Sequence, residues 1–221
     1  MKSIVTVFSI LLLSSGVFAQ EGLKIGLKGG PQSTWMFNAD ESDHSESLYV
    51  STVRSVFGLS LGYNFSDGVG VGLDLLMSNE GQRMEVYGVE VFRKLTYFKV
   101  PLLLNLNTSS EGTAFGYLNV GPQFGFLTSA STGSSNPFSN LLGEDISEGY
   151  KSVNISAVLA LGAGFNLTDF LQLTTGLRFD FGLTDAEDKD SVFYIADPTR
   201  PSTHTATGAL EIGLRYVLRT E

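Results

Sequence analysis

Four charged residues in the last two apolar segments have the types and the spacing to form ion pairs. Each alternates with apolar neighbours, so all four share one face of two predicted strands: Arg178, Asp180, Glu211 and Arg215. A hairpin that pairs Leu171 with Leu218 would place Arg178 directly opposite Glu211. Asp180 and Arg215 would then lie near the same column. Because an unpaired buried charge is costly, we predict a structural cluster of ion pairs and favour it over gating or conduction.

Carboxylates also gather in two polar segments, and oxygen-rich loops can hold Ca²⁺. Neither segment follows the spacing of a calcium-binding EF-hand loop, and neither has the glycine that such a loop needs at its sixth position. We therefore interpret both as solvated loop surface and predict no metal or other cofactor. The two sets are Asp40, Glu41, Asp43 and Glu46, then Asp185, Glu187, Asp188 and Asp190.

The two histidines, His44 and His204, lie in segments that we expect to be loops. Ser42, Asp43 and Ser45 are close to His44 in sequence, but a catalytic triad is defined by geometry and not by sequence proximity. The chain has no cysteine, which excludes disulfides and thiolate chemistry. These observations predict a protein that is not an enzyme.

Long stretches of the chain alternate apolar residues with small or polar ones, which is the pattern of a β-strand. The stretch 57–65, for example, places Phe, Leu and Tyr on one face and Gly, Ser and Asn on the other. Such runs are about 11–13 residues long, whereas globular strands average roughly 5–6 and tilted membrane-spanning strands need about 9–11. Lipid on the apolar face explains both the alternation and the length.

Short and long connections alternate between these strands. Short turns are predicted at 66–68, 107–112 and 166–169, and long polar loops at 31–54, 79–93, 129–151 and 184–205. Outer-membrane barrels have short periplasmic turns and longer outer loops. We therefore predict an all-β fold, an eight-stranded antiparallel up-and-down transmembrane β-barrel with both termini in the periplasm. A lumen of this size is filled by side chains.

Two further details of the strands can be tested against a structure. Pro101 and Pro122 cannot donate to a strand ladder, so each is expected at a bulge or a local gap. Aromatic residues near the strand ends are expected to form two girdles facing the lipid. They are Phe65, Phe165 and Phe170 on the turn side, and Phe57, Tyr97, Phe126 and Phe181 on the loop side, with Trp35 at the outer rim.

The composition and the N-terminal segment limit the possible partners and the cellular location. The formal net charge of −9 leaves no basic stripe to neutralise phosphates, which argues against nucleic acid as a partner. Residues 1–19 have the form of a secretory signal peptide, with Lys2, an apolar stretch and Val17-Phe18-Ala19 before the expected cleavage site. Residues 20–221 would then form the outer-membrane β-barrel domain. The cell outer membrane is the expected location, with the lipid bilayer as the first partner.

Several segments resemble one family. Residues 22–30 (Gly-Leu-Lys-Ile-Gly-Leu-Lys-Gly-Gly) resemble the first strand of the small outer-membrane β-barrel proteins of the Bacteroidota, which include the PorT-like proteins. Residues 95–104, with their Pro-Leu-Leu, and 117–126, with Gly121-Pro122, are similar to two later strands of that family. The resemblance covers nearly all of the mature chain and implies an outer-membrane location. It implies no particular reaction, although some PorT-like members take part in secretion and gliding assemblies.

The last predicted strand resembles the sorting signal that ends many outer-membrane barrels. The positions that match are Glu211, Gly213, Tyr216 and Leu218. The resemblance implies the barrel-insertion machinery as a partner. This chain departs from the pattern because Arg219-Thr220-Glu221 follow the signal and Leu218 replaces the usual aromatic residue.

Two functions fit these observations. The first is a structural or interaction barrel that presents long extracellular loops to surface or envelope partners. The alternative is a transport-linked or protein-secretion-linked component of the outer membrane. A filled lumen favours the first, because eight strands leave no room for the aqueous channel of a porin.

Overall fold

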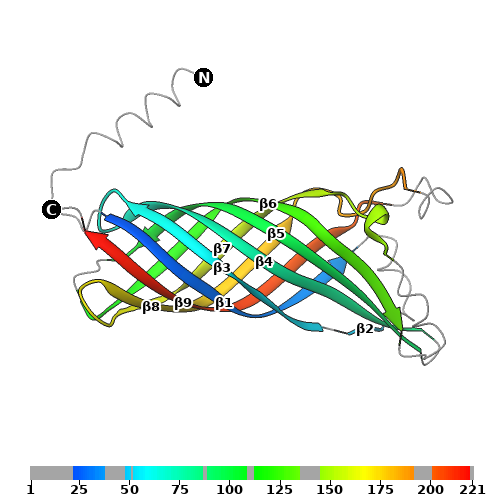
Figure 1. Ribbon diagram of the computed structural model, residues 1–221, viewed down its shortest axis with the longest axis horizontal. Helices are drawn as coiled ribbons and strands as arrows, with labels where there is room; N and C mark the ends of the chain where they lie inside the picture. The colour runs from blue at the N-terminus through cyan, green and yellow to red at the C-terminus, as the bar shows by residue number, and fades with distance from the viewer. Residues whose placement is uncertain are drawn as a thin grey trace, which may run out of the picture.

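The computed structural model describes residues 22–37, 48–50, 52–86, 89–108, 112–134, 145–191 and 201–219. These residues form long antiparallel strands and one short 3₁₀-helix, η3 (Ser147–Gly149) (Figure 1). The strands are β1 (Gly22–Phe37), β2 (Leu48–Val50), β3 (Thr52–Asn64), β4 (Val69–Val86), β5 (Val89–Asn107), β6 (Ala114–Ser134), β7 (Val153–Asn166), β8 (Leu171–Gly182) and β9 (His204–Arg219).

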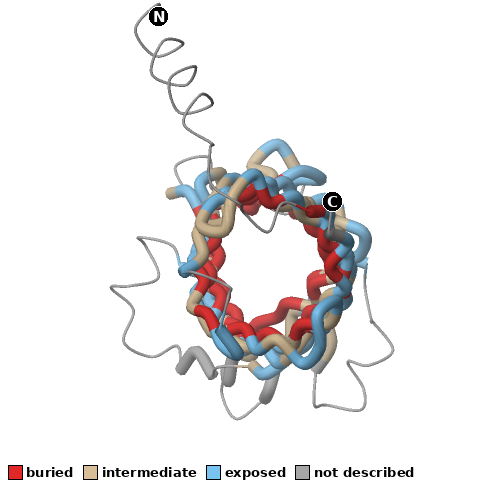
Figure 2. Tube along the Cα trace, turned by 90° about the vertical axis from the view of Figure 1, so that its left-hand side faces the viewer, coloured by how far each residue is buried: buried red, intermediate tan, exposed pale blue. Residues whose placement is uncertain are grey.

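The strands close into a barrel. From β3 to β9 each strand pairs with the next one in sequence, and β1 pairs with both β3 and β9. The short β2 only adds to the outer end of β4, at Leu48↔Glu85 to Val50↔Arg83. Eight strands therefore make up the closed ring, which Figure 2 shows end-on. The predicted eight-stranded antiparallel barrel is confirmed.

The barrel has its polar residues inside and its apolar residues outside. Buried residues line the inner wall in Figure 2, and buried polar and charged residues outnumber the buried hydrophobic ones. On β1, Leu27 is 63% exposed whereas Lys28 beside it is 9% exposed. Successive side chains of a strand point to opposite faces, so each strand gives one row to the lumen and one row to the outer surface. An apolar outer surface of this extent requires lipid around it.

One end of the barrel carries tight turns. The amides of Phe65 and Ser66 donate to the carbonyl of Val69, at 3.0 and 3.2 Å. Leu167 and Thr168 form the same pattern with Leu171, at 2.9 and 3.2 Å. Strands β1 and β9 also begin and end here, since Gly22 pairs with Arg219. The predicted turns at 66–68 and 166–169 are confirmed, and we call this the turn end.

The opposite end, which we call the loop end, is uneven. Strands β4, β5 and β6 have 18, 19 and 21 residues, whereas β7 and β8 have 14 and 12. The β4–β5 pairing continues as far as Val86↔Val89, so the predicted long loop at 79–93 is wrong. Beyond the bilayer both faces of a strand meet water, and the apolar–polar alternation that identifies a strand is lost there. Because β4, β5 and β6 are longer than β7 and β8, they form a raised rim on one side of the barrel opening at the loop end, which we call the mouth.

The two prolines lie beside gaps in the ladder. Pairing of β4 with β5 skips Val100 and Pro101, and pairing of β5 with β6 skips Leu102, Leu103 and their partners Gly121 and Pro122. This confirms the expected local gaps. The one register shift of this strand pair lies elsewhere, between Thr96 and Tyr97.

The outward orientation of the predicted girdle residues is confirmed with one exception. Phe65, Phe165 and Phe170 are exposed near the turn end, and Phe57, Phe126, Phe181 and Trp35 are exposed nearer the loop end. Tyr97 is 2% exposed and lies inside the barrel. The period of two that turns Lys99 inward also turns Tyr97 inward, so its assignment to a lipid-facing girdle is wrong.

Candidate functional site

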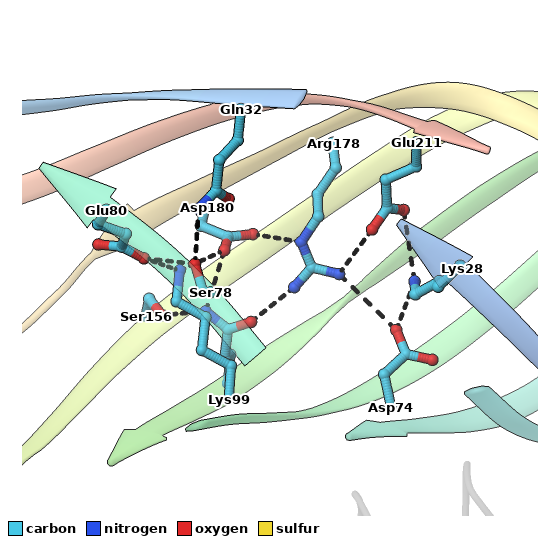
Figure 3. A network of polar contacts seen from close by, with 11 residues as sticks. Lys28, Gln32, Asp74, Ser78, Glu80, Lys99, Ser156, Arg178, Asp180 and Glu211 are labelled. Carbon is cyan, nitrogen blue, oxygen red and sulfur yellow. Dashed lines mark hydrogen bonds and ion pairs between the residues drawn. The ribbon is translucent and has the colours of Figure 1, made fainter. Parts of the chain in front are cut away.

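The centre of the lumen holds a group of charged side chains that come from five strands (Figure 3). All occupy inward positions, and all are buried. Strands β1, β4, β5, β8 and β9 curve around the same axis, so residues far apart in sequence meet there. We call this group the central charge network: Lys28, Asp74, Glu80, Lys99, Arg178, Asp180 and Glu211.

Arg178 is the hub of the network. Its side chain is 2% exposed, and its Nε lies 2.7 Å from Asp180 Oδ1. Its Nη2 donates to Gln123 Oε1 at 2.6 Å. Its Nη1 lies 3.7 Å from both Asp74 Oδ2 and Glu211 Oε1. One planar guanidinium therefore joins carboxylates on three strands, which suits the forked geometry of arginine.

Two lysines pair with these three carboxylates and with Glu80. Lys99 Nζ lies 2.5 Å from Glu80 Oε1 and 2.9 Å from Asp180 Oδ2. Lys28 Nζ lies 2.5 Å from Asp74 Oδ2 and 3.3 Å from Glu211 Oε2. Each carboxylate thus has at least one cation within 4 Å. Such pairing offsets the desolvation of buried charge, which is otherwise expensive.

Neutral polar side chains extend the network toward the loop end. Gln123 Nε2 donates to Ser156 Oγ at 2.8 Å and to Asp180 Oδ2 at 3.1 Å. Gln32 Nε2 donates to Ser78 Oγ at 2.9 Å, and Ser78 Oγ donates to Glu80 Oε1 at 2.9 Å. These bonds hold the carboxylates in one orientation. Chemically, the arrangement supplies rigidity and a filled lumen.

The structure corrects the predicted register of the last hairpin. Leu171 pairs with Tyr216 and not with Leu218, so Arg178 lies opposite Ala209 and Glu211 lies opposite Gly176. A shift of two residues keeps every side chain on its face. Arg178 and Glu211 consequently still meet inside the lumen, at the 3.7 Å given above.

Arg215 does not join the other three predicted residues. It pairs with Gln172 near the turn end, and its guanidinium lies 5.6 Å from the centre of the Tyr117 ring. Among the ion pairs of the described residues, none links Arg215 to Asp180. The prediction that Asp180 and Arg215 lie near the same column of the lumen is therefore wrong. With the register shifted, Asp180 lies opposite Thr207, far along β9 from Arg215.

The sequence analysis predicted three of the seven members of the network, and Lys28, Asp74, Glu80 and Lys99 were missed. Lys28, Asp74 and Lys99 lie in segments that alternate apolar with small or polar residues, but nothing in the sequence links them to Arg178. Glu80 fell in the predicted loop at 79–93. Each is a charged residue at an inward position of a strand, and that shared feature was the signal available.

Space inside the lumen is small. One cavity, beside Glu80, Tyr97 and Lys99, measures about 10 Å³. A second, nearer the turn end, measures about 20 Å³ and is lined by Lys24 and Arg215 among others. A water molecule needs roughly 10–15 Å³ on this measure. Each cavity thus has room for about one water molecule.

A cluster of buried apolar residues lies near the loop end. The segments before β7 and after β8 fold together there, because Lys151 N–H donates to Ala186 O at 3.0 Å and Asp188 N–H donates to Gly149 O at 3.0 Å. The segment before β7 also attaches to β6, since Ile146 N–H donates to Ala130 O at 3.1 Å. We call the buried cluster beneath these segments the mouth cluster: Met36, Leu95, Tyr97, Ala130, Tyr150 and Ala186.

The second acidic set lies in this mouth region and makes local bonds. Asp185 Oδ1 accepts from the amides of Glu187 at 3.2 Å and Thr203 at 3.0 Å, and Asp185 Oδ2 lies 3.1 Å from Lys189 Nζ. Desolvation opposes ionisation, but these bonds and Lys189 outweigh it and hold the pKa of Asp185 below its usual value. Within the described residues, no group of three or more His, Asp or Glu side chains is placed to hold a metal ion.

The residues considered for catalysis are not brought together. His204 Nδ1 lies 3.1 Å from Gly182 O, and its ring lies 6.0 Å from that of Phe37. His44 and its neighbours Ser42, Asp43 and Ser45 lie outside the described residues, as do Asp40, Glu41 and Glu46.

The candidate sorting signal occupies the turn-end half of β9. Tyr216 and Leu218 face outward and are 46% and 44% exposed, and the Tyr216 ring lies 5.4 Å from that of Phe170. Glu211 and Gly213 face the lumen. Tyr216 and Leu218 therefore face the lipid.

Together, the closed ring, the apolar outer surface and the filled polar lumen define a membrane-spanning β-barrel. The family model described as "Outer membrane protein beta-barrel domain" matches residues 18–188. The chain belongs to this family, and it therefore lies in the outer membrane in contact with the lipid bilayer. No curated protein sequence matches the chain.

Solved structures with a similar fold are also outer-membrane proteins. OprG from Pseudomonas aeruginosa is 13% identical, with 91% of this chain and 99% of that chain covered and a TM-score of 0.52. Neisserial surface protein A is 12% identical, with 88% and 97% covered and a TM-score of 0.47. Identities this low reflect the shared fold alone.

Proposed function

We propose that this protein is a plugged outer-membrane barrel of structural or interaction type, which presents its loop end to surface or envelope partners. The observation that carries the proposal is the central charge network, which fills the lumen with paired and buried side chains. The two cavities in this part of the lumen measure about 10 and 20 Å³, which supports a lumen too tightly filled to pass a solute. The function then resides on the outer surfaces of the barrel.

Planar-bilayer recording tests this directly. The purified full chain should give no stable unitary current under conditions in which a 16-stranded porin, as a positive control, conducts through its aqueous channel. Stable unitary currents would overturn the plugged barrel and favour the transport-linked or secretion-linked alternative.

The raised rim supports the choice of the loop end as the partner surface. Strands β4, β5 and β6 extend there beyond their neighbours, and β2 widens the rim by pairing with β4 (Figure 1). A photo-crosslinking amino acid at Lys94, which is exposed near the rim, should yield a discrete protein adduct in cells. The same probe at the lipid-facing Leu104 is the matched control and should yield none. Equal labelling at both positions would contradict a partner at the rim.

The same proposal includes biogenesis and orientation. Residues 1–19 act as a cleaved signal peptide, the turn end and both termini face the periplasm, and β9 is read by the barrel-insertion machinery. The outward Tyr216 supports the last step. Tyr216→Ala should slow insertion into the outer membrane, whereas Tyr63→Ala, at another exposed aromatic residue near the turn end, should not. Equal insertion rates for both variants would remove β9 as the signal.

We also infer that the chain belongs to the PorT-like branch of small Bacteroidota barrels, on the strength of residues 22–30 and 95–104. A role in secretion would follow only for that branch. Deletion of the gene followed by measurement of secreted protein in the culture medium tests it, and unchanged secretion would remove the role.

A further inference from the structure

Two cations lie close together in the turn-end half of the lumen. On the paired strands β1 and β9, Lys24 lies opposite Val217 and Arg215 lies opposite Gly26, so Lys24 and Arg215 are diagonal neighbours on the inner face. Diagonal neighbours on a sheet are about 7–8 Å apart at the backbone, within reach of long side chains. Gly26 allows this arrangement, because a Cβ there would lie only 2.9 Å from Arg215 Cγ. We call the two residues the turn-end cations.

Neither turn-end cation is neutralised by a carboxylate in the lumen. In the part of the chain that the structure describes, no ion pair includes Lys24 or Arg215, and Arg215 instead makes a cation–π contact with the Tyr117 ring. Asp67, in the turn between β3 and β4, is within electrostatic range of Lys24, but no ion pair joins the two residues. Lys24 is 8% exposed, so water does little to screen the repulsion between the two cations.

A cavity lies beside these cations. It measures about 20 Å³, and Lys24, Arg215, Asn105 and Asn119 line it. Two glycines create the space: Gly62 pairs with Lys24 on one side and with Gly72 on the other, so two adjacent strands contribute no side chain at this level. The other charged groups of the wall are Lys28 and Asp74, which already neutralise each other.

We propose that this cavity binds one small monovalent anion, with chloride as the physiological case, between the Lys24 ammonium and the Arg215 guanidinium. The two cations provide the attraction, and the side-chain amides of Asn105 and Asn119 can donate N–H bonds to the ion. A space of this size accepts a single-atom ion and excludes phosphate or a carboxylate-bearing solute. The anion is a fixed part of the plug and neutralises charge at the turn end.

Bromide substitution tests the site on the unmodified protein. Bromide replaces chloride in most chloride sites and scatters X-rays anomalously. Crystals of the full chain grown in sodium bromide should show an anomalous peak in the cavity between Lys24 and Arg215. Absence of a peak there at full bromide occupancy of the solvent would overturn the proposal, because it would mean that Lys24 sheds its proton or that water fills the space.

Chloride-35 NMR line broadening provides a solution test with matched variants. The folded wild-type protein in detergent should broaden the line, and unlabelled bromide should reverse the broadening. Lys24→Met should weaken the affinity by about tenfold or more, the equivalent of roughly 1.4 kcal/mol. Lys94→Met, which removes an exposed cation at the rim, is the control and should leave the affinity unchanged. Equal loss in both variants, or broadening retained in Lys24→Met, would show that chloride binds elsewhere.

Discussion

The two regions of the lumen differ in whether their buried cations are paired with carboxylates. The central charge network brings three cations and four carboxylates together, and each carboxylate has a cation within 4 Å. The turn-end cations lie in the same narrow barrel, and among the described residues no carboxylate is within 4 Å of either, although Asp74 lines the same cavity. Burial is therefore not what separates stable from costly charge here. The difference is whether the strand registers bring opposite signs to the same level.

The number of strands that contribute residues explains why the two arrangements should differ in their contribution to stability. The central network draws on β1, β4, β5, β8 and β9, so the closed ring itself brings the charges together. The turn-end cations come from β1 and β9 alone, which are direct neighbours. We expect the central network to contribute to the stability of the closed barrel, and the turn-end cations to depend on a bound anion.

Arg178→Met should give the largest loss of stability. It removes the cation that joins Asp180, Asp74 and Glu211, and breaking a buried pair from one side costs about 3–5 kcal/mol. The midpoint of urea unfolding and the heat-modified migration of the folded barrel on gels measure the effect.

Arg215→Met is the matched control for this variant, because it also removes an arginine that faces the lumen. It should cost far less than Arg178→Met, since Arg215 makes a cation–π contact but no ion pair with the other described residues. Equal losses in the two variants would mean that pairing does not distinguish the two regions.

How far the sequence predicts this contrast depends on which structural feature is considered. Alternation with a period of two was sufficient to place Lys28, Asp74 and Lys99 on the inner face, and turn residues located the short connections. The pairing register of neighbouring strands could not be predicted from this alternation. A slip of one residue would move every side chain to the wrong face, but a slip of two leaves the pattern unchanged. The predicted β8–β9 hairpin was wrong by that undetectable amount.

The missed part of the candidate site has a second physical cause. Glu80 lies on a strand that continues beyond the apolar stretch, where alternation no longer marks a strand. The packing of the mouth cluster also depends on Tyr150 and Ala186, which belong to segments outside the strands. Such contacts arise from tertiary folding, and local sequence pattern carries no signal for them.

A double-mutant cycle on Glu80 and Lys99 should give the next largest effect. Lys99→Met leaves Glu80 and Asp180 each without one cation, and Glu80→Gln removes one of the two charges that Lys99 contacts. The double variant should be less destabilised than the sum of the singles, with a coupling free energy of about 0.5–3 kcal/mol. Urea unfolding of the four proteins measures it. Additive effects would mean that the 2.5 Å contact contributes nothing to stability.

Lys24 and Lys28 offer a sharper comparison, because they lie four residues apart on the same face of β1. In sodium gluconate, without chloride, Lys24→Met should raise the unfolding midpoint, since it removes repulsion from Arg215 worth about 0.2–1 kcal/mol. Lys28→Met should lower the midpoint, because Asp74 and Glu211 lose a cation. Thermal unfolding of both variants in gluconate measures the two signs. Shifts in the same direction would break the distinction between the two halves of the lumen.

The smallest effect should come from the ion pair of Asp185 with Lys189, which lies outside the bilayer. The pKa of Asp185 is lowered in the folded protein, so its contribution is fully present above its ordinary value of 3.8 and is lost as the pH falls through the folded value. Wild type should therefore resist limited proteolysis at residues 185–191 at pH 6 and become susceptible only below about pH 4. Asp185→Asn should be susceptible at both pH values, because its amide keeps an acceptor for Thr203 but loses the charge that Lys189 meets. In both proteins the folded barrel, held by the central charge network, should keep its heat-modified migration on gels throughout this pH range. Equal resistance of Asp185→Asn and wild type at pH 6 would remove the carboxylate from the stability of this loop and leave buried pairing as the only electrostatic contribution of measurable size.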